Sequence, residues 1–255
     1  MADLAEPSVR GGGAPLVGES LLSRARRGAK ALAEDLLPEK VVVWRGREAR
    51  RGRFSSLGRA VLGARAVAPT PSRVVLTFDD GPTPLTLEYL RALSALGVRA
   101  TFFVVGELCA EHPELVSAIA DAGHELAGHG YTHRRFTTLS PSELRGELEQ
   151  TASLLPRTRA ARELVRPPYG ALSPSTLLTC SSAGFTTVMW SANSGDWQSR
   201  DAKEVARVTT ARPLTPGEIV LLHEGQHWTL NALPAIVGSL RKAGHELVTV
   251  GELLA

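Results

Sequence analysis

One junction recurs through residues 72–255 and limits what this chain can fold into. A segment with helical periodicity ends at a glycine, and a β-prone run follows almost at once, at Gly97, Gly123, Gly184 and Gly244. Glycine ends helices at low cost because it adopts positive φ without a Cβ clash. Helices that alternate with short strands in this way are typical of a parallel sheet covered by helices.

The number of these alternations indicates the architecture. A capping box at Ser140-Pro141-Ser142-Glu143 predicts a helix that runs to about Leu155. We predict an α/β fold with about seven parallel strands, a distorted or incomplete (β/α) barrel that is smaller than a full eightfold TIM barrel. The β-prone runs lie at 74–78, 100–105, 124–126, 164–166, 185–190, 218–222 and 245–250.

Residues 1–71 have a different composition. They contain Gly11-Gly12-Gly13, a linker at 66–71 that is rich in alanine and proline, and many of the basic residues of a chain whose formal net charge is +3. We interpret 1–71 as a basic, partly ordered N-terminal extension and 72–255 as the catalytic domain. Contact of the extension with a polyanion or a membrane surface is an alternative. We assign the extension no function.

The chain lacks the signals of membrane insertion and export. No apolar run approaches the roughly 18 residues that a spanning helix needs, and the N-terminus lacks the apolar block of a secretory signal. By default we expect a cytoplasmic or membrane-surface location, with an extracellular one left open. We also expect a monomer that does not bind nucleic acid.

Two adjacent carboxylates stand at the end of the first predicted strand. Thr77-Phe78-Asp79-Asp80-Gly81-Pro82 runs from a β-prone segment into Asp79 and Asp80, and Gly-Pro then ends the strand. Two like charges side by side favour protonation of one carboxyl unless a cation faces them. The string is compatible with a solvated turn or with a pair held by a metal or an arginine.

Polar residues also follow the other predicted strands. In a (β/α) barrel the carboxyl ends of all strands meet at one face, where active sites lie. We therefore expect these side chains to gather there: Asp79, Asp80, His129, His133, Arg166, Tyr169, Asn193, Asp196, Trp197 and His223.

The three-residue gap between His129 and His133 brings two imidazoles to one side of a turn. With one carboxylate they form a set that leaves positions open for water, as catalytic zinc requires.

The region from about 72 to 255 resembles the polysaccharide deacetylase family, which is the nodulation-deacetylase homology domain or carbohydrate esterase family four. Five motifs in order carry the resemblance: Thr77 to Pro82, His129 to His133, Arg166-Pro167-Pro168-Tyr169-Gly170, Ser194-Gly195-Asp196-Trp197, and Leu221-Leu222-His223. The resemblance implies hydrolysis of an N-acetyl or O-acetyl group on a sugar. It also implies a carbohydrate substrate and a divalent metal, expected to be Zn²⁺, with Co²⁺, Ni²⁺ and Fe²⁺ left open.

The resemblance further implies a role for each site residue. Asp80, His129 and His133 would hold the metal, while Asp79 would be the general base, tethered by Arg166. The backbone N–H of Tyr169 would help to stabilise the oxyanion, and His223 would be the general acid. Leu221 and Trp197 would form walls of the acetyl pocket, with Asp196 and Asn193 in the same substrate pocket.

Three residues depart from the family pattern. Gly130 follows the first histidine where the family usually has Ser or Thr, so a loop-stabilising hydroxyl is missing. Asn193 stands at an acidic position credited with tuning the catalytic histidine, although Asp196 remains nearby. A neutral partner stabilises an imidazolium less than a carboxylate does, which predicts a lower pKa for His223. Glu224 replaces the usual Asp after His223, and we expect little effect from this change.

Other functions stay open at this point. The same mechanism could act on a lipid-linked or small sugar amide, as a deacetylase or deformylase. A non-catalytic carbohydrate-binding relative predicts the loss of a ligand or of the base, and the sequence retains all of them. A nucleic-acid-binding module that uses the basic extension is a further alternative.

Overall fold

The structure is a computed structural model of the chain, and it describes residues 72–156 and 163–255. The extension at 1–71, with its linker, lies outside the described residues. The described elements follow in chain order: β1 (Ser72–Gly81), α3 (Thr86–Ala95), β2 (Thr101–Val104), α4 (Gly106–Glu111), α5 (Pro113–Asp121), β3 (Glu125–Gly128), η2 (Phe136–Thr138), α6 (Pro141–Leu154), β4 (Leu164–Val165), η3 (Pro168–Gly170), α7 (Pro174–Ser182), β5 (Thr186–Thr187), β6 (Ala192–Asn193), α8 (Ala202–Thr209), β7 (Ile219–His223), α9 (His227–Lys242), β8 (His245–Val248) and α10 (Val250–Leu254).

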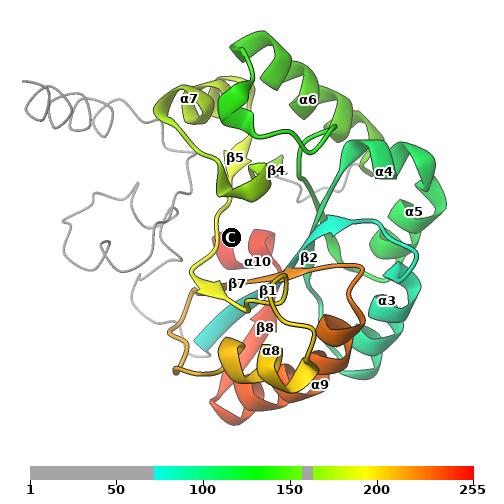
Figure 1. Cartoon of the computed structure of the whole chain (residues 1–255), viewed down its shortest axis with the longest axis vertical. Helices are drawn as coiled ribbons and strands as arrows, with labels where there is room; N and C mark the ends of the chain where they lie inside the picture. Colours follow the sequence, from blue (N-terminus) through cyan, green and yellow to red (C-terminus); the bar gives the residue numbers. More distant parts are fainter. Residues whose placement is uncertain (1–71, 157–162) are drawn as a thin grey trace, which may run out of the picture. The chain divides into compact units, whose positions relative to one another are not determined.

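The strands form one curled parallel sheet (Figure 1). Their order is β5-β4-β3-β2-β1-β7-β6, and β8 pairs in parallel with the first residues of β1. Because β5 and β6 are the two ends of this order, the sheet curls without pairing its ends. The predicted α/β fold, an incomplete (β/α) barrel, is confirmed. The two-residue strand β6 is additional, since so short a strand has no periodicity to detect.

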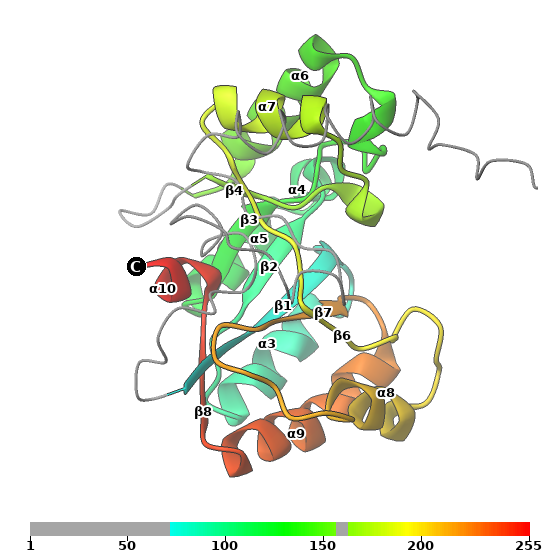
Figure 2. The ribbon, with the colours of Figure 1, turned by 90° about the vertical axis from the view of Figure 1, so that its left-hand side faces the viewer.

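The helices cover the outside of the curled sheet in the order of the strands they follow. Contacts run from α7 to α6, α4, α5, α3, α9 and α8 in turn. Figure 2 shows α6 and α7 at one end of the sheet and α8 and α9 at the other. The predicted capping box of α6 is present, with Ser140 accepting from the backbone N–H of Glu143. The four junction glycines all have positive φ, as predicted.

Strand β1 divides the molecule into an outer and an inner core. Leu76 and Phe78 are fully buried among residues of the surrounding helices, whereas Val75 packs with residues of the inner cluster. Successive side chains on a strand point to opposite faces, so Thr77 and Asp79 share the inner face with Val75. The inside of the sheet therefore becomes polar toward the carboxyl end of β1, which positions the site there.

Membrane crossing has no support among the described elements. None of the helices in residues 72–156 and 163–255 is both long and apolar enough to span a bilayer.

Candidate active site

The two carboxylates at the end of β1 have different environments. Asp79 is buried and continues the inward face of the strand, while the side chain of Asp80 is 42% exposed. The pairing of β1 with β2 is irregular between Asp79 and Gly81, and Asp80 has φ +72. This left-handed conformation, which Asp tolerates better than most residues, turns the second side chain out of the strand alternation. Both carboxylates consequently reach the same end of the sheet.

Arg166 lies inside the sheet and binds Asp79. Its side chain is fully buried, and Nη1 donates to Asp79 Oδ1 at 2.6 Å and to Thr77 Oγ1 at 2.8 Å. The guanidinium also lies over the Phe103 ring, with Cζ 4.0 Å from the ring centroid. Burial lowers the pKa of Arg166, and the charge of Asp79 opposes this effect. A guanidinium keeps its proton nonetheless, so the charge of Asp79 is compensated.

The backbone of Arg166 positions a second site residue. Its carbonyl oxygen lies 2.8 Å from His129 Nδ1. A carbonyl can only accept, so Nδ1 carries the proton and Nε2 presents a lone pair. His129 Nε2 lies 3.4 Å from Asp80 Oδ1 and 3.7 Å from Asp79 Oδ2. This is the usual support of a metal-binding imidazole, in which the second ring nitrogen is held by an acceptor.

The structure brings Asp80, His129 and His133 together as a donor set. One ligand atom from each of the three lies within 4.8 Å of the others, and His133 Nε2 is 3.0 Å from Asp80 Oδ1. Burial alone would raise the pKa of Asp80, but the imidazoles of His129 and His133 beside its carboxylate hold that pKa well below the usual range. Two imidazoles and one ionised carboxylate are the donors of a catalytic Zn²⁺ site, so the residues fit a divalent metal.

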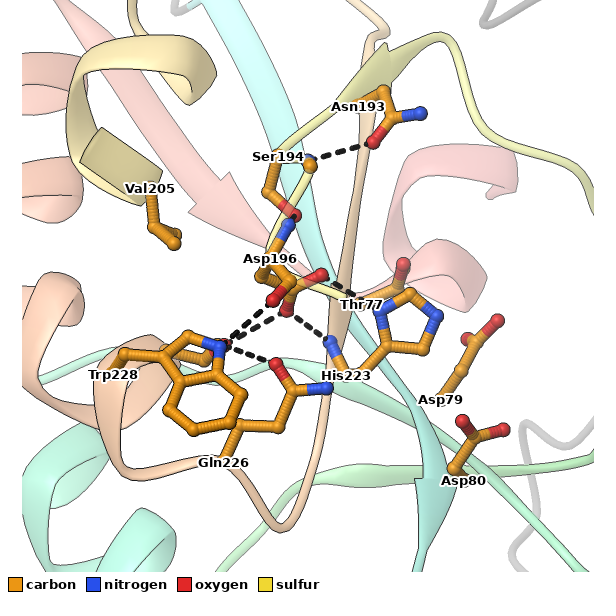
Figure 3. A network of polar contacts seen from close by, with 12 residues as sticks. Thr77, Asp79, Asp80, Asn193, Ser194, Asp196, Val205, His223, Gln226 and Trp228 are labelled. Carbon is orange, nitrogen blue, oxygen red and sulfur yellow. Dashed lines mark hydrogen bonds and ion pairs between the residues drawn. The ribbon is translucent and has the colours of Figure 1, made fainter. Parts of the chain in front are cut away.

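His223, at the end of β7, is held by Asp196. Figure 3 shows the imidazole with Asp196 on one side and the Asp79 and Asp80 carboxyls on the other. Asp196 Oδ1 lies 2.8 Å from His223 Nδ1, and Oδ2 accepts from the His223 backbone N–H and from Thr229 Oγ1. Burial of His223 opposes protonation, but the hydrogen bond and charge of Asp196 outweigh it and raise the pKa of His223.

This geometry corrects two expectations. The predicted fall in the pKa of His223 is wrong, because Asp196, not Asn193, is the partner of the imidazole. Asn193 is exposed, and its side chain accepts from the backbone N–H of Gly195 (Figure 3). Asp196 is fully buried behind His223, and neither residue lines the cavity in which we expected them. In the short strand β6 and the turn after it, the direction of a side chain depends on tertiary packing, which the sequence did not reveal.

A cavity of about 370 Å³ joins these groups. The expected Trp197, Leu221 and Tyr169 line it, and the Trp197 ring meets the His223 ring edge to face at 5.3 Å between centroids. Tyr169 has φ +59 and a 59% exposed side chain, which lies beneath the Arg135 guanidinium. The residues that line the cavity are Asp79, Asp80, His129, His133, Tyr169, Gly170, Trp190, Trp197, Leu221, His223 and Gln226.

Trp190 and Gln226 are lining residues that the sequence analysis missed. Trp190 ends a predicted strand, and nothing in its position along the sequence indicated that its ring faces a cavity. Gln226 comes three residues after His223, and its proximity to a motif was the one signal that could have found it.

Comparisons with known proteins agree with the geometry. The profile of the polysaccharide deacetylase family matches residues 66–188. A chitooligosaccharide deacetylase of Bradyrhizobium is 34% identical in an alignment of 198 positions that covers 71% of this chain and 90% of the relative. The chain belongs to the polysaccharide deacetylase family. A family 4 carbohydrate esterase from Streptomyces lividans, solved with acetate, superposes with a TM-score of 0.62 at 34% identity and covers 68% of this chain and 90% of that one.

Other members of the family are longer. A peptidoglycan N-acetylglucosamine deacetylase of Listeria monocytogenes is 33% identical over 188 residues, which are 73% of this chain but 40% of the relative. The chain thus spans about two fifths of the length of that deacetylase.

The family departure at Glu224 has a clear place in the structure. Its carboxyl is buried, Oε1 accepts from the N–H and hydroxyl of Thr83 and from the hydroxyl of Thr86, and its backbone N–H donates to Asp79 O. A Cβ on Gly81 would lie 1.9 Å from Oε2, so the turn after Asp80 packs directly on this carboxyl. Among the described residues Oε2 has no hydrogen-bond partner. Burial raises the pKa of Glu224 to about 7, against the opposing hydrogen bonds of the threonines.

This raised pKa predicts a pH dependence of stability. The unfolded carboxyl has a pKa near 4.5, so the folded state binds the extra proton between about pH 4.5 and 7. The contribution of this group to the free energy of unfolding is fully present below about pH 4.5, and it is lost as pH rises to about 7. We expect wild type to lose about 3 kcal/mol relative to Glu224→Gln between pH 4.5 and 8, measured by urea unfolding. Glu88→Gln, at an exposed position of α3, should keep the wild-type dependence, and an equal dependence in Glu224→Gln would contradict the assignment.

Proposed function

We propose that residues 72–255 form a metal-dependent hydrolase that removes acetyl groups from N-acetylated or O-acetylated sugars. One observation supports this most directly. A single cavity presents a three-donor metal set, a buried carboxylate held by Arg166, and an imidazole backed by Asp196. Each of the three groups matches one need of amide hydrolysis: a metal, a base for water and an acid for the departing nitrogen.

Asp80, His129 and His133 would hold the divalent ion, which we expect to be Zn²⁺. When bound, such an ion supplies a lowered pKa for water and polarisation of the acyl oxygen. Asp79 is the base in this proposal. Arg166 holds its Oδ1, so Oδ2 is the oxygen left to take a proton from the attacking water.

The remaining steps use the other side of the cavity. His223 gives its proton to the departing nitrogen, and Asp196 fixes the ring so that Nε2 is the donating atom. Leu221 and Trp197 provide apolar walls for the acetyl methyl group. The backbone N–H of Tyr169 donates to the developing oxyanion, a contribution of about 3 kcal/mol for one such donor.

The substrate follows from the relatives. The Bradyrhizobium relative is named as a chitooligosaccharide deacetylase, and the Listeria relative as a deacetylase of the N-acetylglucosamine of peptidoglycan. We therefore propose N-acetylglucosamine oligomers as the first substrates for this chain.

Acetate release tests the proposal. Chitooligosaccharides, peptidoglycan fragments and acetylated xylan are incubated with the full chain, with and without a chelator. We expect chelation to abolish release and Zn²⁺ to restore it. Asp79→Asn should lower kcat by at least about 100-fold, because an amide cannot accept the proton. Glu88→Gln serves as the control and should keep wild-type activity.

Two outcomes would overturn this function. A hydrolase that is insensitive to chelator, or one unaffected by Asp79→Asn, has a different mechanism. Sugar binding without acetate release from any substrate would instead identify a non-catalytic carbohydrate-binding relative.

The contact between Asp196 and His223 predicts the pH at which activity falls on the alkaline side of the pH profile. An acid must be protonated to act, so activity falls as pH rises through the pKa of His223, which Asp196 raises. Asp196→Asn should therefore move the alkaline limb of kcat/KM to lower pH, with a matching fall in the His223 pKa by NMR titration. Asn193→Asp is the matched control and should leave the limb in place. The assignment of Asp196 as the partner fails if the two variants behave in the opposite way.

A further inference from the structure

A carboxylate outside the cavity holds the loop between the two histidines of the donor set. Glu147 on α6 is 8% exposed. Its Oε2 accepts from the backbone N–H of Tyr131 at 2.6 Å and of Thr132 at 2.8 Å, and Oε1 accepts from the Thr132 hydroxyl. Within residues 72–156 and 163–255, no arginine, lysine or histidine forms an ion pair with it. The Glu147 carboxylate therefore binds the loop between the two histidines and no basic side chain of the described residues.

The loop needs such support because of its backbone conformation. Gly130 has φ +80 and His133 has φ +56, so two of the five residues from His129 to His133 are in the left-handed region. A non-glycine residue there is disfavoured unless its surroundings impose it.

Contacts from two helices impose this conformation. The N–H groups of Gly106 and Glu107, at the start of α4, donate to the carbonyls of Gly130 and Tyr131. Glu147 on α6 accepts from the loop N–H groups on the other side. The polar backbone of the loop is thus paired with groups that lie outside it.

We propose that Glu147 is a positioning residue, which sets the spacing of His129 Nε2 and His133 Nε2 and thereby the affinity of the donor set for a divalent metal. This inference rests on the proposed function, because it assumes that Asp80, His129 and His133 bind the metal. Outer groups that orient metal ligands typically change affinity 10–100-fold when removed. Glu147 acts on both imidazoles at once, since the residues it binds lie between them in the chain.

The same contacts explain how the loop functions with glycine at position 130. A Cβ there would lie 3.1 Å from the Phe136 ring, 3.4 Å from Glu147 Oε2 and 3.5 Å from Pro168. A side chain at this position crowds the Phe136 ring, touches the Glu147 carboxylate and strains the positive φ. The missing hydroxyl therefore does not leave the loop unsupported, because Glu147 supplies the acceptor from α6.

Zn²⁺ affinity of the purified full chain tests the proposal. A chelator first removes bound metal from the chain. Zn²⁺ is then titrated against a competing chelating indicator at pH 7, at a temperature well below the unfolding temperature of each apo variant. We expect Glu147→Ala to weaken Zn²⁺ binding about 10–100-fold. Glu147→Gln should stay within about threefold of wild type, because its amide oxygen still accepts from the loop and its NH₂ can donate to the Thr132 hydroxyl. Glu149→Ala, at an exposed position of the same helix, should equal wild type.

Each result has one meaning. Wild-type Zn²⁺ affinity in Glu147→Ala, with a lower apo unfolding temperature, would show that Glu147 only stabilises the fold and would overturn the proposal. If Glu147→Ala does not fold, Glu147→Asp replaces it, because its carboxylate is one methylene short of the loop; affinity equal to wild type would again overturn the proposal. Absence of Zn²⁺ binding by the wild type would instead overturn the proposed function.

Position 130 gives a separate expectation. Gly130→Ser introduces a residue that the family usually carries, yet we expect it to weaken Zn²⁺ binding about tenfold, because the new Cβ crowds the Phe136 ring and strains the positive φ of the loop. The same titration measures this effect. Binding as tight as wild type, or tighter, would contradict this expectation, because it would show that the loop accepts a side chain at position 130 without loss of the donor geometry.

Discussion

The buried ion pair between Arg166 and Asp79 is the interaction on which the site depends. A guanidinium that is fully removed from water is unfavourable unless acceptors surround it, and here Asp79, Thr77 and the carbonyl of Val188 provide them. Such a pair adds little to stability compared with a well-packed apolar core, but removal of one partner leaves an uncompensated buried charge. The pair therefore fixes where the carboxyl end of β1 lies relative to the segment after β4.

The sheet register extends this constraint to the proposed metal ligands. Gly128 pairs with Val165 across β3 and β4, so His129 and Arg166 are the next residue on each strand. The carbonyl of Arg166 then holds His129, while its side chain holds Asp79. One residue thus positions the proposed base and a proposed metal ligand, which follow different strands. Substitution of Arg166 consequently affects stability, the base and the ligand together, and no single-residue measurement separates these effects.

The sequence predicted the parts of the site that local rules determine. The helix–glycine–strand junctions predicted the fold, and the ends of the predicted strands placed Asp79, His129, Arg166 and His223 at one face. It did not predict which of Asn193 and Asp196 faces His223, because these residues stand on either side of a turn whose direction is decided by tertiary packing. Glu147 was not identified because it lies in the middle of an amphipathic helix, where a glutamate is normally solvated. Its contact with the loop requires α6 to pack beside β3, which no local pattern encodes.

Three buried carboxylates share one task around the cavity. Asp196 accepts from the backbone N–H of His223, Glu147 from those of Tyr131 and Thr132, and Glu224 from that of Thr83. The backbone segments that they bind are the turn after β1, the loop after β3 and the last residue of β7, where the pairing of these strands ends. A carboxylate offers about four acceptor positions on a short stem, which suits it to fix a loop that no strand can hold. Burial of these charges is unfavourable by itself, and it persists here because each carboxylate fixes a backbone segment next to an active-site side chain.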